Sequence, residues 1–204
     1  MICFFGPDGS GKTTLAHKLV ERLLQEGIQV RLAWLRGSHT FASVLAKILK
    51  RFAVFQGEDN PYYGLSIPKR MILLWELIEI LSILPVWFAR YLIPRFLGYT
   101  VIGERSLLDF IVWVSITTRD YRFPASIGGK IFLTISLKSC LNVYVTANIK
   151  TLIERRKHEH TFKFLALQLA FYNILAKIIK APVIDTTNTS AEEHLKGIGK
   201  SFNF

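Results

Sequence analysis

The segment that most constrains this chain is a glycine-rich octapeptide near its start, GPDGSGKT at residues 6–13. It fits the pattern G-x-x-x-x-G-K-[S/T], follows the apolar run Ile2–Phe5 and opens the helical pattern Lys12–Gln25. Glycines let successive backbone amides point at phosphate oxygens, and the N-terminus of the following helix adds a partial positive charge. The octapeptide therefore predicts a nucleotide phosphate site on a strand–loop–helix unit.

Each residue type in this loop has an expected role. Lys12 is expected to reach the β- and γ-phosphates of ATP, and the hydroxyl of Thr13 is expected to bind Mg²⁺. ATP and Mg²⁺ are therefore the predicted nucleotide and metal. The residues predicted to bind the ATP phosphates are Gly6, Asp8, Gly9, Ser10, Gly11, Lys12, Thr13 and Thr14.

Short β-branched or aromatic runs alternate along the chain with longer helical patterns, which is typical of a parallel sheet with crossover helices. A length of 204 residues suits one domain. We therefore predict an α/β protein, a single P-loop kinase domain over residues 1–204. Its predicted fold is the three-layer P-loop NTPase fold, with helices flanking a five-stranded parallel sheet. The predicted strands are Ile2–Phe5, Gln29–Leu35, Tyr99–Ile102, Leu141–Thr146 and Pro182–Asp185.

The intervening segments carry apolar residues at helical spacing. Pro85 is expected to break or kink the most apolar of them, because proline lacks an amide hydrogen and crowds the preceding turn. The stretch at residues 56–66, QGEDNPYYGLS, is predicted to be a loop from its composition. The predicted helices cover Lys12–Gln25, Phe41–Phe55, Pro68–Leu84, Val86–Leu97, Leu107–Thr117, Ala125–Leu137, Ile149–Lys157, Phe162–Ile179 and Ala191–Lys200.

The charge of the chain indicates anionic partners. Lysine and arginine together number 26, against 15 aspartate and glutamate residues, so the formal net charge is +11. A field of that sign concentrates anions near the surface. Nucleotide substrates fit this charge, and so do nucleic acid and anionic membranes. A basic surface without a macromolecular partner is the remaining alternative.

Three features bear on cellular location. Cys3 and Cys140 are too few and too far apart for a disulfide framework or a four-ligand metal site. The residues before the glycine-rich loop lack the basic and long apolar regions of a secretory signal. Charged residues and a proline interrupt the apolar segment Met71–Ile93 well short of the ~18 apolar residues of a membrane span. We therefore predict a cytoplasmic protein.

Four segments together resemble the thymidylate kinase family. GPDGSGKTT resembles its phosphate loop, in which an acidic residue and glycine precede GKTT. Thr100–Ser106 resembles the family's third strand, which ends in Asp-Arg. Leu141–Thr146 and the following Leu152–Arg156 resemble its strand and helix that lead to a basic lid, and Val183–Asp185 resembles its last strand. The resemblance extends over the strand order of the whole chain.

The resemblance implies a kinase that transfers the γ-phosphoryl group of ATP to dTMP, giving dTDP. Phosphoryl transfer depends on positioning and on neutralising charge. Glu104 is accordingly expected to hold Mg²⁺ together with Thr13, and Arg105 to bind the acceptor phosphate or the transferred group. By family position, Arg36 is also an acceptor-binding residue. The predicted catalytic residues are Lys12, Glu104, Arg105 and Arg156.

The same resemblance implies a basic lid at about residues 155–163, with Arg155, Arg156 and Lys157 as its cations. A closing lid would bring guanidinium groups to the phosphates and exclude water. The alternative is a solvated helix end, where cations are favoured by the helix dipole. Thr40 is expected to cap the helix that starts near Phe41, since threonine satisfies free amides there.

The chain departs from the family on the acceptor side. Glu104 replaces the expected aspartate, Ser106 replaces an aromatic residue, and the arginine-bearing segment before the third strand is missing. Another small, lipid-like or nucleic-acid acceptor therefore remains open, as does a nucleotide-binding module that has lost transfer. The apolar segment 71–97 is left with three interpretations: core, homodimer interface or membrane-facing surface.

Overall fold

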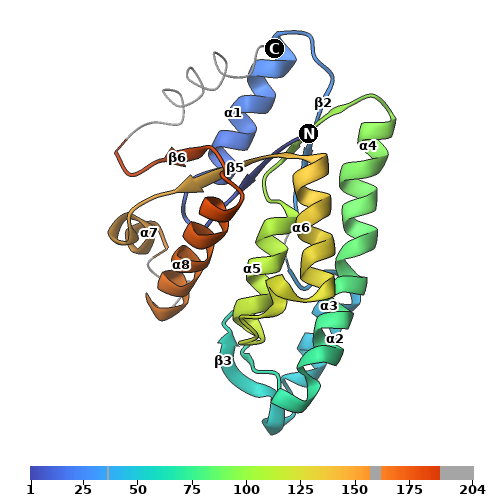
Figure 1. Ribbon diagram of the computed structural model, residues 1–204, viewed down its shortest axis with the longest axis vertical. Helices are drawn as coiled ribbons and strands as arrows, with labels where there is room; N and C mark the ends of the chain where they lie inside the picture. The colour runs from blue at the N-terminus through green and yellow to red at the C-terminus, as the bar shows by residue number, and fades with distance from the viewer. Residues whose placement is uncertain (36, 157–161, 189–204) are drawn as a thin grey trace.

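The sheet of this protein is all-parallel and lies between helices, as the sequence predicts (Figure 1). In the computed structural model, the described residues are 1–35, 37–156 and 162–188. The strand order is β2-β4-β1-β5-β6, and each of the five strands lies within a residue or two of its predicted bounds. The strands are β1 (Ile2–Phe5), β2 (Val30–Ala33), β4 (Thr100–Gly103), β5 (Leu141–Thr146) and β6 (Val183–Asp185).

The central strand β1 sends alternate side chains into two cores. Ile2 and Phe4 pack against α1 (Lys12–Gln25). Cys3 and Phe5 point to the opposite face, which is covered by α5 (Leu107–Thr117) and α8 (Phe162–Ile178). Because successive side chains of a strand alternate between faces, an entirely apolar strand requires helices on both sides. The result is a three-layer arrangement.

The remaining helices differ from prediction mainly at proline and at their ends. Of the break or kink predicted at Pro85, the break is wrong, because that residue lies inside α3 (Ile72–Trp87). A π-helical turn at Phe88–Leu92 follows α3. The predicted helix Ala191–Lys200 lies outside the described residues. The other helices are α2 (Thr40–Leu49), α4 (Ile93–Phe96), α6 (Ile127–Ser139) and α7 (Ile149–Arg155).

The segment predicted as a loop at residues 56–66 contains a short strand, β3 (Gln56–Asn60), so that prediction is wrong over these five residues. Antiparallel bridges join both ends of β3 to Leu65. The amide of Gly57 donates to the carbonyl of Gly64 at 3.2 Å, and this closes a small hairpin outside the main sheet. The polar composition suggested a loop, but these backbone hydrogen bonds form a hairpin. Tyr62 lies in its turn.

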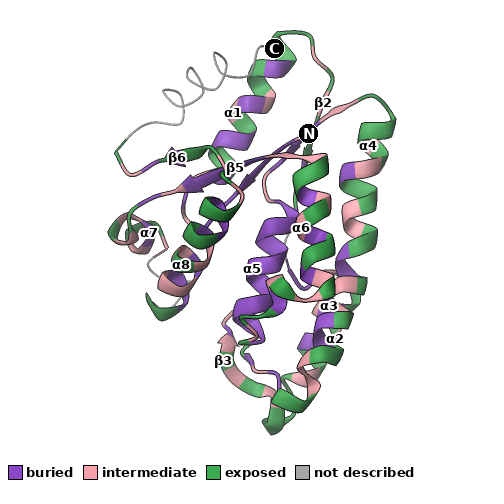
Figure 2. Cartoon of the chain, in the orientation of Figure 1, coloured by how far each residue is buried: buried purple, intermediate pink, exposed green. Residues whose placement is uncertain are grey.

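Two apolar helices, α3 and α5, differ sharply in burial. Every residue of α5 is buried. The helical run Lys69–Phe96 is long and apolar enough to cross a membrane. Only 28% of its most apolar 18-residue stretch is buried inside the protein. In Figure 2, α5 is purple, whereas green segments alternate with purple and pink ones along α3 and α4. Glu76 and Glu79, the acidic residues that interrupt this segment in the sequence, lie on its buried side.

Candidate functional site

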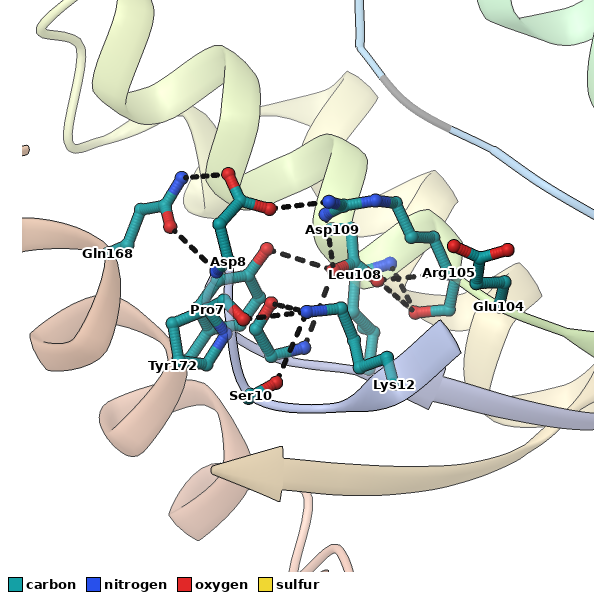
Figure 3. Close-up of polar contacts among 12 residues, drawn as sticks. Pro7, Asp8, Ser10, Lys12, Glu104, Arg105, Leu108, Asp109, Gln168 and Tyr172 are labelled. Carbon is teal, nitrogen blue, oxygen red and sulfur yellow. Dashed lines mark hydrogen bonds and ion pairs between the residues drawn. The ribbon is translucent and has the colours of Figure 1, made fainter. Parts of the chain in front are cut away.

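The glycine-rich loop (residues 6–13) joins β1 to α1 at the carboxyl edge of the sheet and curls around one side chain (Figure 3). The ammonium group of Lys12 donates to the carbonyls of Gly6 at 2.8 Å and Pro7 at 2.7 Å, and to the hydroxyl of Ser10 at 3.2 Å. Gly9 has a φ of 86°, and a Cβ at Gly6 would lie 2.0 Å from the carbonyl oxygen of Val145. Glycine is therefore required at both positions.

Lys12 keeps a usable positive charge despite its burial. Burial and the neighbouring Arg105, partly offset by Asp8 and Asp109, together lower the pKa of Lys12 to about 8. The ammonium form therefore predominates at neutral pH. An anionic group entering the loop would raise the pKa again and strengthen the attraction.

Asp8 joins the loop to three other elements. Its carboxylate forms an ion pair with Arg105, which follows β4. The same carboxylate accepts the hydroxyl of Tyr62 at 2.6 Å and the side-chain amide of Gln168 at 3.4 Å. Gln168 also accepts the backbone amide of Asp8 at 3.1 Å. Asp8, on the glycine-rich loop, is thereby tied to the β3 hairpin and α8 as well as to the end of β4.

Asp109 is a second buried carboxylate in this network. It caps the start of α5 by accepting the amide of Ser106 at 2.8 Å. Its other oxygen accepts the hydroxyl of Tyr172 at 2.9 Å and lies 3.6 Å from the guanidinium of Arg105. Burial raises the pKa of Asp109, and Arg105 opposes that rise. Burial alone would lower the pKa of Arg105, but Asp8 and Asp109 raise it, so the guanidinium stays charged.

Thr13 and Glu104, the two predicted metal-binding residues, lie together. The hydroxyl of Thr13 donates to the carboxylate of Glu104. They meet because β1 and β4 are neighbouring parallel strands, with Cys3 opposite Gly103. The residues that follow these two strands, including the start of α1, therefore lie side by side. The described residues contain no cluster of three or more His, Cys, Asp or Glu side chains that suits a metal. These two oxygen donors fit Mg²⁺ with the rest of its shell supplied by phosphate and water.

The end of α7 lies against the glycine-rich loop. Arg155 donates to the carbonyl of Gly9 at 3.1 Å and to the hydroxyl of Thr186 at 3.0 Å. A Cβ at Gly9 would approach Cγ of Arg156 to 3.1 Å, so the absence of a side chain there admits the arginine. Two predicted site residues, Arg36 and Lys157, lie outside the described residues, as do residues 157–161 of the lid predicted at about 155–163.

These groups enclose a cavity of about 340 Å³ over the glycine-rich loop. We call it the loop cavity. It brings together most of the residues predicted to bind the ATP phosphates with Arg105, which follows β4, and with Arg155 and Arg156 at the end of α7. Its lining residues are Asp8, Gly9, Gly11, Lys12, Thr13, Thr14, Leu15, Arg105, Arg155, Arg156 and Thr186.

A second cavity has a volume of about 350 Å³, and we call it the aromatic pocket. The rings of Tyr62 and Trp113 lie 5.3 Å apart, and the indole nitrogen of Trp113 donates to the hydroxyl of Ser38 at 3.2 Å. Tyr62 lines this pocket, and its hydroxyl donates to Asp8, which lines the loop cavity. The pocket is lined by Trp34, Gly37, Ser38, His39, Thr40, Ser43, Tyr62, Tyr63 and Trp113.

Glu79 fixes the floor of the aromatic pocket from α3. Its carboxylate accepts both the amide of Ser38, at 2.8 Å, and the hydroxyl of Ser38. These bonds hold Ser38 at a φ of 52°, a conformation unusual for serine. Burial raises the pKa of Glu79, and the bonds from Ser38 oppose the rise. The prediction that Thr40 caps α2 is wrong: His39 occupies that position, and Thr40 donates to the carbonyl of Ser82 at 3.1 Å.

Sequence reasoning missed Asp109, Tyr62, Trp113, Gln168 and Tyr172 as members of the site. For Asp109 a signal existed, because Ser106 and Asp109 have the spacing of a capping box ahead of an apolar run. The others stand in helices or a turn without a local motif, and tertiary packing alone brings them together. Against known proteins, the sequence matches no family model and no curated protein.

Proposed function

We propose that this protein is an ATP- and Mg²⁺-dependent P-loop phosphotransferase of thymidylate kinase type. One observation carries the proposal. The ammonium of Lys12 sits inside a glycine-rich strand–loop–helix turn that lines a cavity together with Thr13, Arg105, Arg155 and Arg156. Glu104 adjoins this cavity through its hydrogen bond from the hydroxyl of Thr13. This is the set of groups that phosphoryl transfer requires, namely positioned donors and concentrated positive charge.

The loop cavity is the proposed site for the triphosphate of ATP. Lys12 would exchange its bonds to loop carbonyls for bonds to the β- and γ-phosphates, because a phosphate oxygen is the stronger acceptor for an ammonium group. Thr13 and Glu104 would hold Mg²⁺, which supplies further neutralisation of phosphate charge when bound. Arg156 lines the same cavity and is placed to stabilise charge on the transferred group.

The aromatic pocket is the proposed acceptor site. Planar bases stack on aromatic side chains, and base–aromatic stacking contributes about 1–3 kcal/mol per base. Tyr62 and Trp113 offer such surfaces, and the hydroxyl of Tyr62 reaches Asp8 at the border with the loop cavity. A nucleoside monophosphate bound there would direct its phosphate toward Arg105. dTMP is the first candidate because the sequence resembles thymidylate kinases.

The proposal is tested by measuring ADP formation with Mg²⁺ and a panel of dTMP, dUMP, UMP, CMP, AMP and GMP. Acceptor-dependent ADP formation above the hydrolysis background, with the phosphorylated acceptor identified by mass, is the expected result. The Lys12→Ala variant sets the background for contaminating kinases. Turnover that persists in that variant would show that the activity does not come from this site.

A separate binding measurement keeps the result interpretable. Mg²⁺-dependent binding of ATP, followed by the shift in unfolding temperature, reports on the loop cavity alone. Binding of ATP without turnover of any acceptor in the panel would contradict nucleoside monophosphate kinase activity. It would favour a nucleotide-binding module or a phosphotransferase for a different acceptor. Absence of ATP binding would reject the whole proposal.

A further inference from the structure

The helix α3 exposes an unbroken apolar stripe. Leu73, Leu77, Leu81 and Phe88 recur at helical spacing on the side that faces away from the core, and Leu73 is 78% exposed. The opposite side of the helix, which includes Trp75, is buried. Contiguous exposed apolar surface of this kind marks a contact with a partner or a membrane. We therefore expect a binding partner or a membrane to cover the stripe.

The neighbouring helix α2 widens this surface. Phe41, Val44 and Ile48 are each about half exposed and follow one another along one side of α2. α2 is fastened to α3 by the bond from the amide of Ala42 to the hydroxyl of Ser82, at 3.0 Å. We call the exposed apolar side chains of the two helices the α2–α3 face.

The exposed charges carried by the two helices and the segments that flank them in the sequence all have one sign. Within residues 40–51 and 69–97, which are all described, the acidic residues are Glu76 and Glu79, and both are buried. The exposed charged residues of the same segments are therefore cations without exception. They are Lys47, Lys50, Arg51, Lys69, Arg70, Arg90 and Arg95.

We propose that the α2–α3 face docks on an anionic membrane surface, with both helices lying along the plane of the interface. An interfacial helix combines leucine and phenylalanine on the side that enters the acyl boundary with lysine and arginine at the head groups. Long basic side chains extend along apolar surface while keeping their charge at the polar boundary. Both elements of that arrangement are present here.

Charge complementarity favours a membrane over the other occupants of such a face. A second copy docked face to face would bring two sets of exposed cations together without exposed carboxylates from these segments to pair them. Nucleic acid would satisfy the cations but leave the apolar side chains in water. A surface of anionic lipid satisfies the cations and covers the apolar stripe at once.

Docking would also bring the aromatic pocket close to the lipid head groups. Ser43 lines that pocket, and its neighbour Val44 belongs to the α2–α3 face. Helix α2 thus contributes one side to the proposed acceptor site and another to the docking surface. The docking inference itself is independent of the proposed activity, because it concerns binding in the absence of nucleotide.

The experiment is flotation of the purified full chain with vesicles of phosphatidylcholine, with and without phosphatidylglycerol, at low and high salt. We expect binding to the anionic vesicles at low salt, and at least about tenfold weaker partitioning when Lys47, Lys50 and Arg51 are all changed to glutamine. The double variant Leu77→Ser with Leu81→Ser is expected to lose a similar factor, because it removes apolar area without changing charge.

Matched controls lie elsewhere on the surface. Leu24→Ser on α1 and Ile178→Ser on α8 replace side chains that are 55% and 67% exposed, and they should leave partitioning unchanged. Absence of vesicle binding would overturn the proposal, as would binding that the Leu77/Leu81 variant does not weaken. Light scattering on the vesicle-free protein supplies the remaining outcome. A dimer that dissociates in the Leu77/Leu81 variant would identify a second copy as the occupant instead.

Discussion

The loop cavity and the aromatic pocket are similar in volume, at about 340 and 350 Å³, but they are built in opposite ways. The loop cavity is built around one contiguous octapeptide, which supplies Asp8, Gly9, Gly11, Lys12 and Thr13 to its lining. The aromatic pocket collects side chains from the end of β2, the start of α2, the β3 hairpin and α5. The comparison shows that a site formed by one contiguous motif can be predicted from the sequence, whereas a site assembled by the packing of distant segments cannot.

The two cavities meet at a single carboxylate. Asp8 lines the loop cavity, and its bond to the hydroxyl of Tyr62 reaches the wall of the aromatic pocket. Its ion pair with Arg105 is largely buried, with 4% and 14% of the two side chains exposed. Variants at this junction should affect both cavities, and variants on either side should affect one.

The largest effect is expected from Asp8→Ala, which leaves the buried guanidinium of Arg105 without its nearest counter-charge. Removing one member of a buried ion pair costs about 3–5 kcal/mol of stability. Denaturant unfolding should therefore show a free energy of unfolding lower by about that amount. Glu21→Ala, which removes an exposed carboxylate from α1, is the control and should change stability by less than about 0.5 kcal/mol.

Combining Arg105→Met with Asp8→Ala separates the contribution of the charge interaction to stability from that of packing. With both charges removed, the double variant should be destabilised less than the sum of the two single variants. Simple additivity would show that the ion pair does not couple these residues. It would contradict the role of Asp8 as the junction between the cavities.

The next effect is confined to the loop cavity. Lys12→Ala should lower kcat for phosphoryl transfer about 10²–10³-fold, because it removes a positioned cation from the transferred phosphate. Unfolding temperature should change little by comparison. Lys177→Ala, which removes an exposed cation from α8, should leave turnover unchanged. A Lys12→Ala enzyme that retained full activity would place the chemistry elsewhere.

Tyr62→Phe should act mainly on the aromatic pocket, because Asp8 keeps its ion pair with Arg105 and its hydrogen bonds with Gln168. It removes the 2.6 Å bond to Asp8 and keeps the ring beside Trp113. A hydrogen bond of net worth about 0.5–1.5 kcal/mol corresponds to a rise of about 2- to 12-fold in KM for the acceptor. KM for ATP should stay constant, and Tyr121→Phe on the exposed turn after α5 should change neither constant. A rise in KM for ATP alone would assign Tyr62 to the donor side.

The same contrast explains how far the sequence could be interpreted. The strands of the sheet and α1 follow from short β-branched or aromatic runs and one motif, so they are predictable locally. The prediction that Thr13 and Glu104 share a metal rests on the resemblance to thymidylate kinases. Trp113 is part of an entirely buried helix, and nothing in LLDFIVWVSIT marks this residue as pocket-lining. Its role comes from Ser38, 75 residues earlier, which only the folded chain brings within 3.2 Å.

Helix α3 shows a second limit of sequence reasoning. Its composition alone is compatible with a core helix, and its neighbour α5 is one. The position of Pro85 suggested an interruption, but α3 continues through the proline to Trp87, and a π-helical turn follows that no local pattern specified. Which apolar stripe is covered depends on the packing of α2 and α6 around α3, and therefore on contacts distant in the sequence.

The smallest effect concerns pH and separates the two buried acids of α3. The carboxylate of Glu79 is held by Ser38, whereas one oxygen of Glu76 has no hydrogen-bond partner among the described residues. Burial, together with the nearby Asp120, raises the pKa of Glu76 from 4.5 to about 7. The folded state therefore binds more protons than the unfolded state between these values, and stability falls as the pH rises from about 4.5 through about 7.

Glu76→Gln should remove this part of the pH dependence, because the amide has no proton to release. Relative to the unmodified protein, the variant should gain on the order of 1 kcal/mol at pH ~8 and nothing near pH ~5. Unfolding temperature measured across this range, with Glu21→Gln as an exposed control, checks the sign as well as the size. A residual fall in stability with rising pH is expected from Glu79, whose pKa burial also raises. If the dependence of stability on pH is unchanged in Glu76→Gln, Glu76 is ionised in the folded protein throughout this range. Its burial beside Asp120 would then not raise its pKa.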